Sequence, residues 1–85
     1  MQKRLGFVGL IIEDRENNAA NVNSLLSEFG DIILARTGVP CPERHCSAIT
    51  LVIDATTNQL GALTGQLGRI SGVSVKSMLS KMQHA

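Results

Sequence analysis

Hydrophobic residues follow two different periods along the chain, and the change of period separates expected strands from expected helices. Residues 5–12, LGFVGLII, are apolar at both alternating sets of positions. Leu5, Phe7 and Ile11 are predicted to point to one face, and Val8, Leu10 and Ile12 to the other. Residues 47–54, SAITLVID, repeat this two-faced pattern. A strand that is apolar on both faces is typical of the middle of a sheet.

Two segments have the spacing of amphipathic helices. Val22, Leu25, Leu26 and Phe29 recur at i, i+3, i+4 and i+7 and predict a helix over about residues 18–29. Gly30 follows at the position of a C-cap glycine. Thr56 and Gln59 match a capping box, and the leucines at 60, 63 and 67 continue a second helix to residue 68 or 69.

Residues 31–39 and 73–79 complete the set as two further strands, and the first of these forms a hairpin with residues 47–54. The order βαββαβ predicts an α+β fold of the ferredoxin-like class. In this fold a four-stranded antiparallel sheet carries both helices on one face, here as a single domain over residues 1–85. The other apolar face would be uncovered, so we expect a homo-oligomer, at least a dimer, packed through its sheet faces.

The amino-acid composition indicates which kinds of molecule the protein can bind. At 85 residues the core is thin, which makes help from a second subunit reasonable. Trp and Tyr are absent and the formal net charge is +1, so neither base stacking nor phosphate neutralisation is supported and no direct nucleic-acid binding is expected. No segment has the length of a membrane span or the pattern of a signal peptide. The expected location is the cytoplasm.

The hairpin tip, PCPERHC, contains the only two cysteines of the sequence. Cys41, His45 and Cys46 could ligate zinc, nickel or copper(I), with a fourth ligand from another subunit or water. The spacing lacks a second ligand pair, however. A plain hairpin tip is the favoured interpretation, while the metal site and a disulfide or redox pair remain alternatives.

A glycine-rich stretch, GALTGQLGRISG, covers the later part of the second expected helix and the residues that follow it. It lacks the lysine and the position of a phosphate-binding P-loop. Each glycine inside a helix costs about 1 kcal/mol relative to alanine, so something should compensate. Close packing of the helix against a neighbour is the favoured explanation, and a small ligand that touches the backbone is the alternative. The ligand hypothesis names Gly61, Thr64 and Gly65. Elsewhere no catalytic triad or carboxylate pair is evident, so we expect neither an enzyme nor a bound cofactor.

Three segments together carry a family resemblance: GFVGLIIEDRE, SEFGDIILARTGVP and IDATTNQLGALTGQLGRISGVSVKSMLSK. They resemble the small bacterial family of iron-only hydrogenase system regulators. The resemblance implies a ferredoxin-like fold, similar to amino-acid-binding ACT domains and to the ligand-sensing domain of the nickel-responsive repressor. That repressor also has a DNA-binding domain, so DNA contact here would need a partner. The family's hairpin tip resembles PYRERG, so no family role passes to Cys41, His45 or Cys46.

The resulting hypothesis is a small oligomeric regulatory module. It would bind a small ligand or a metal at a subunit interface and pass a change of shape or assembly to a protein partner, in connection with iron-only hydrogenase expression or maturation. The alternative is a structural or chaperone-like partner in metallocluster assembly that has no ligand of its own.

Overall fold

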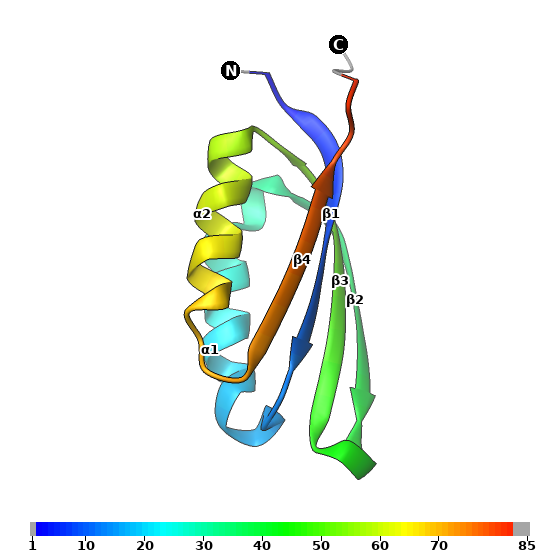
Figure 1. Cartoon of the computed structure of the whole chain (residues 1–85), viewed down its shortest axis with the longest axis vertical. Coiled ribbons are helices and arrows are strands. Elements are labelled where there is room, and N and C mark those ends of the chain that lie inside the picture. Colours follow the sequence, from blue (N-terminus) through cyan, green and yellow to red (C-terminus); the bar gives the residue numbers. More distant parts are fainter. Residues whose placement is uncertain (1, 83–85) are drawn as a thin grey trace.

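The computed structural model describes residues 2–82, which form a four-stranded antiparallel sheet and two α-helices. The elements in chain order are β1 (Arg4–Ile12), α1 (Arg15–Glu28), β2 (Ile33–Cys41), β3 (Cys46–Ala55), α2 (Thr57–Gly68) and β4 (Val73–Leu79). Short 3₁₀ turns precede β2 (Gly30–Ile32) and β3 (Pro42–Arg44). The strand order is β2-β3-β1-β4. Both helices lie on one side of the sheet (Figure 1), and the predicted ferredoxin-like fold is confirmed.

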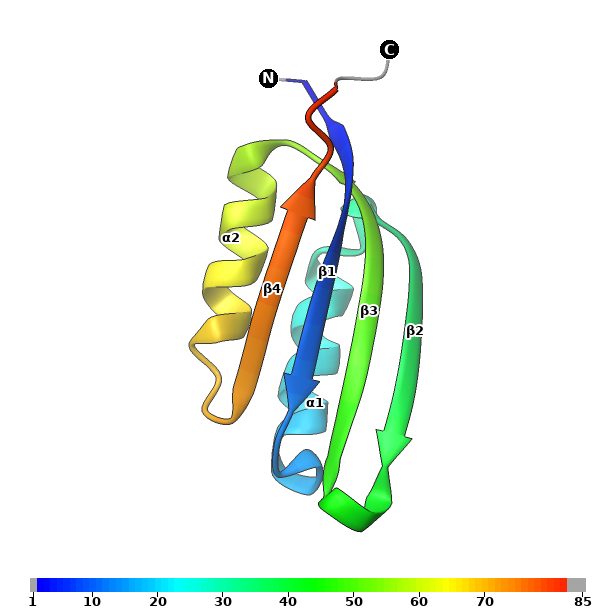
Figure 2. The same cartoon turned by 45° about the vertical axis from the view of Figure 1, so that its right-hand side comes forward.

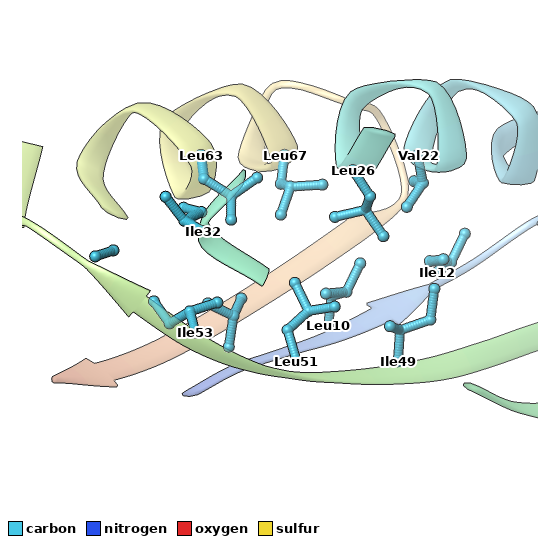
Figure 3. Packing of buried hydrophobic residues seen from close by; sticks show 12 residues of the cluster. Leu10, Ile12, Val22, Leu26, Ile32, Ile49, Leu51, Ile53, Leu63 and Leu67 are labelled. Atoms are coloured by element: carbon cyan, nitrogen blue, oxygen red, sulfur yellow. The ribbon is translucent and has the colours of Figure 1, made fainter. Parts of the chain in front are cut away.

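The two-faced strands β1 and β3 are the central pair of the sheet, as their sequences predict (Figure 2). Their register places Val8 opposite Leu51 and Leu10 opposite Ile49, and paired residues in an antiparallel sheet point to the same face. The helix-facing side forms the core (Figure 3). Its buried members are Val8, Leu10, Ile12, Val22, Leu26, Ile32, Ile49, Leu51, Ile53, Ala55, Leu63 and Leu67.

The boundaries of helix α1 differ from the sequence prediction at both ends. Helix α1 begins at Arg15, three residues earlier than expected, because Asp14 takes a left-handed conformation with φ of 49° and turns the chain directly into the helix. Its other end also needs a correction: Phe29 is the C-cap residue, and Gly30 begins a 3₁₀ turn without a positive φ. The helix stripe itself is confirmed, with Val22 and Leu26 buried.

Helix α2 begins with the predicted capping box. The Thr56 hydroxyl accepts a hydrogen bond from the Gln59 amide at 3.1 Å, and the Gln59 side-chain oxygen accepts one from the Thr56 amide at 2.9 Å. Two backbone donors that the first turn leaves free are thereby satisfied. Leu63 and Leu67 then face the sheet and are buried. The capping box therefore sets the start of the helix that covers β4.

The β2–β3 hairpin pairs as far as Cys41 and Cys46, and Pro42 opens the 3₁₀ turn that follows. Pro40 remains within β2 because this is an edge strand, where a missing backbone donor is tolerated. Within residues 2–82, no helix has the length and apolar character required to cross a membrane.

Candidate functional site

The sheet face opposite the helices carries large apolar side chains in contact with solvent. Six of them are 40–55% exposed: Leu5, Phe7, Ile11, Val39, Val52 and Met78. We call these six residues the outer patch. They come from all four strands, and Figure 1 shows no helix on this side.

The strand register divides the outer patch into two apolar rows. Val52, Phe7 and Met78 lie side by side across β3, β1 and β4. A second row crosses the sheet at Val39, Ala48 and Ile11. Between the rows lie the small or polar residues Thr37, Thr50, Gly9 and Lys76. Lys76 belongs to the edge strand β4, where a long side chain can keep its charge in water.

Cys41 and Cys46 form the last residue pair of the β2–β3 hairpin, directly opposite each other. Both are free thiols and half-buried. Directly opposed residues on antiparallel strands have Cα atoms about 4.5–5.5 Å apart, which lies within the range that a disulfide spans. The sequence alternative of a disulfide or redox pair therefore stays open.

The position of Cys46 at the end of the hairpin affects the pKa of its thiol. Desolvation raises the pKa of the Cys46 thiol, and the nearby Cys41 and Glu13 raise it further because each disfavours a thiolate. Arg44 acts in the opposite direction. The thiolate is the form that ligates metals and attacks electrophiles. The surroundings of Cys46 therefore disfavour its thiolate and make this thiol less reactive.

Backbone hydrogen bonds tie the hairpin to the start of α1. The Arg15 amide donates to the His45 carbonyl at 3.0 Å, and His45 takes a left-handed conformation with φ of 54°. On the other side, the Glu13 amide donates to the Gly72 carbonyl at 2.7 Å. Gly72 has φ of 84°, a conformation that favours glycine. Three chain reversals are therefore held together at one end of the sheet.

The residues proposed as metal ligands do not form a three-ligand group. Among residues 2–82, no three His, Cys, Asp or Glu side chains converge in a set that could hold a metal ion. The structure brings the two cysteines together, but His45 does not join them as a third ligand. Metal binding by Cys41, His45 and Cys46 stays a prediction that only a chemical measurement can test.

Replacing both cysteines by serine, Cys41→Ser with Cys46→Ser, is expected to change the free energy of unfolding by no more than about 1 kcal/mol. The pair lies at the end of a hairpin, away from the core cluster. Elemental analysis of the parent protein, purified without chelator, is expected to find no stoichiometric metal. One equivalent of metal, lost together with stability in the double variant, would show that the hairpin is a structural metal site.

The glycine-rich face of α2 is open. A Cβ atom built on Gly61, Gly65 or Gly68 would meet nothing within 4 Å, so the expected close packing of these glycines is wrong for a single chain. Thr64, between them, donates its hydroxyl to the Leu60 carbonyl at 3.0 Å within the helix. A ligand at Gly61, Thr64 and Gly65 stays a prediction, now with space for it to approach.

Both the sequence and the fold of this chain are similar to those of known proteins. Residues 4–77 match the family of TM1266-like proteins, described as "Iron-only hydrogenase system regulator, putative". The chain belongs to this family. Its similarity to the uncharacterised protein TM1266 from Thermotoga maritima extends over 94% of this chain and 100% of that one, with 41% identity and a TM-score of 0.90. Among curated proteins, no sequence matches this chain.

More distant structures share the fold of this TM1266-like chain. The ACT domain from GTP pyrophosphokinase of Chlorobium tepidum is 19% identical, covers 89% of this chain and 99% of that domain, and gives a TM-score of 0.76. The nitrogen regulatory PII-like protein CPII from Thiomonas intermedia is 15% identical over 89% of this chain and 90% of that one, with a TM-score of 0.55. At these identities the likeness concerns the fold alone.

Proposed function

We propose that this TM1266-like chain is a cytoplasmic, non-enzymatic regulatory module that assembles through its outer patch and senses a small ligand. A single observation carries the proposal: six large apolar side chains are half-exposed on one sheet face. Apolar patches of this kind mark interaction surfaces. The family description supports a regulatory role in the iron-only hydrogenase system, and we extend it to expression or maturation of that enzyme.

A second copy of the chain is the partner that best fits the outer patch. Its two apolar rows, separated by small residues and threonines, are spaced so that side chains of an identical face could interdigitate with them. Dimers with two-fold symmetry are also the commonest soluble oligomers. An assembled face would leave α1, α2 and the hairpin free to contact a ligand or a further protein.

A thermal-shift screen with metabolites and metal salts tests the sensing part of the proposal. A ligand that prefers the native state raises Tm, and the shift grows with the ratio of the ligand concentration to its Kd. Gly61→Ala and Gly65→Ala are informative variants, because each is expected to raise the free energy of unfolding by about 1 kcal/mol where nothing opposes the added methyl group. If a ligand contacts α2 at Gly61 or Gly65, the added methyl group should block it. The two variants should then no longer show the rise in Tm that the ligand causes in the parent protein.

An unchanged Tm with every compound would favour the alternative, a structural or chaperone-like partner in metallocluster assembly with no ligand of its own. Ligand stabilisation that Gly65→Ala leaves intact would move the binding site away from α2. Regulation through DNA would require a separate DNA-binding partner.

A further inference from the structure

A groove lies on the helix side of the sheet, between α1 and the edge strand β2. It encloses about 240 Å³ and is lined by Arg15 and Asn23 of α1, Arg36 of β2 and Ser47 of β3, with Ile12 and Ile49 as its apolar floor. The groove is on the opposite face of the sheet from the outer patch, because Arg36 pairs with Leu51, whose side chain is in the core. Of the six outer-patch residues, only Val39, on the edge strand β2, also borders the groove.

Two guanidinium groups give the groove a positive charge that no ion pair cancels. Arg36 donates to the side-chain oxygen of Asn23 at 2.8 Å, a neutral acceptor that orients the guanidinium. Within residues 2–82, neither Arg15 nor Arg36 forms an ion pair with a carboxylate. The lining of the groove contains no Asp or Glu. Guanidinium groups bind carboxylate and phosphate oxygens with paired, charge-assisted hydrogen bonds.

Ser47, at the bottom of the groove, adds a hydroxyl that can also bind an anion. It is 9% exposed and is the buried polar residue of a described core that is otherwise hydrophobic. It occupies the inward position of β3 that continues the row of Ile49, Leu51 and Ile53. The Ser47 side chain has no hydrogen-bond partner within residues 2–82, and no side-chain oxygen there is sealed from solvent without one. The Ser47 hydroxyl is therefore accessible from the groove that the residue lines. It could donate one hydrogen bond to an anion held by the arginines.

Gly38 leaves room for such a ligand. It lies on β2 opposite Ile49, on the inward side of the strand, and an added Cβ there would meet nothing within 4 Å. A larger side chain at this position would occupy the groove without disturbing the core.

We propose that this groove binds a small dianion, a phosphate monoester or a short dicarboxylate. Two guanidinium groups and one hydroxyl match the charge and the acceptors of such a group, and the volume suits a molecule of only a few heavy atoms. The inference rests on the proposed function, since it names the chemical class of the ligand that the module would sense.

The test is an NMR titration of the full chain with inorganic phosphate and, separately, succinate, at constant ionic strength against sodium chloride. We expect saturable shifts of the amide signals of Arg36, Gly38 and Ser47 with at least one of the two dianions, with a Kd of about 1 mM or tighter. Saturation by phosphate alone assigns the ligand to phosphate monoesters, and saturation by succinate alone assigns it to dicarboxylates. Shifts that do not saturate, or that equal those with chloride, would overturn the proposal.

Variants separate the groove from the rest of the surface. Arg36→Gln is expected to weaken binding about tenfold or more, because it removes a charged donor. Gly38→Val should abolish binding by filling the groove, with the charges unchanged. Arg44→Gln, an exposed arginine of the hairpin turn outside the groove, should leave binding within about twofold. Equal losses in Arg36→Gln and Arg44→Gln would reduce the effect to general surface charge and overturn the site.

The oligomeric mass, measured on the same samples, distinguishes this inference from the proposed function. A chain that assembles but binds neither dianion overturns the groove as a site and leaves the assembly standing. A monomer that binds phosphate or succinate in the groove overturns the assembly and leaves the site standing.

Discussion

Val52→Lys is expected to convert the assembled protein into monomers of 9.1 kDa. Val52 lies on the central strand β3 and pairs with Phe7 on β1, so it is near the middle of the outer patch. A lysine there would place an unpaired charge in an apolar interface. In a two-fold symmetric dimer both copies carry the substitution, so the interface would contain two such charges. One uncompensated buried charge costs about 3–5 kcal/mol, which weakens association by roughly a hundredfold or more.

The control for this variant is Ser24→Lys, which adds the same charge at an exposed position of α1, on the helix side of the molecule. It should leave the mass unchanged. Circular dichroism should show that the Val52→Lys monomer keeps the fold, since Val52 is outside the buried core cluster. If Val52→Lys keeps the parent mass, or if both variants dissociate alike, the outer patch is not the interface.

The second large effect concerns the opposite face of the same strand. Leu51 is fully buried at the centre of the core, between the helices and the sheet. Leu51→Ala is expected to lower the free energy of unfolding by about 2–5 kcal/mol, through lost apolar burial and the cavity that remains. In a chain of 85 residues with a thin core, a loss of this size takes away much of the total stability.

Urea unfolding at a fixed protein concentration measures this difference. Thr50→Ala, the adjacent exposed position on β3, is the matched control and should cost about 1 kcal/mol or less. Similar losses for the two variants would mean that the two faces of β3 are not divided into core and surface as the structure has them.

The arrangement of the elements was predictable because each depends on a short-range pattern. The two-faced runs around Val8 and Leu51 required a central position, and the capping box at Thr56 and Gln59 fixed the start of α2. The left-handed conformation of Asp14 was not predictable, since it depends on contacts between distant segments. Asn18 holds that corner, donating its side-chain amide to the Glu13 and Ser71 carbonyls at 2.8 and 2.9 Å.

The candidate sites were less accessible to sequence reasoning. The motif at Cys41, His45 and Cys46 is compact in sequence, yet the left-handed turn at His45 leaves the two thiols as a pair. The groove residues Arg15, Asn23, Arg36 and Ser47 belong to three separate elements, and they meet only through the β2–β3 register and the packing of α1 beside β2. One signal was present in the sequence: Ser47 lies near the start of a strand whose other inward positions are hydrophobic, so a buried hydroxyl could have been suspected.

The mass of the unmodified protein in solution tests the central claim most directly. Sedimentation equilibrium at micromolar concentration should give at least about twice the 9.1 kDa of the chain, because exposed apolar patches such as the outer patch mark surfaces that bind another surface. A stable, soluble monomer of 9.1 kDa under these conditions would contradict the account.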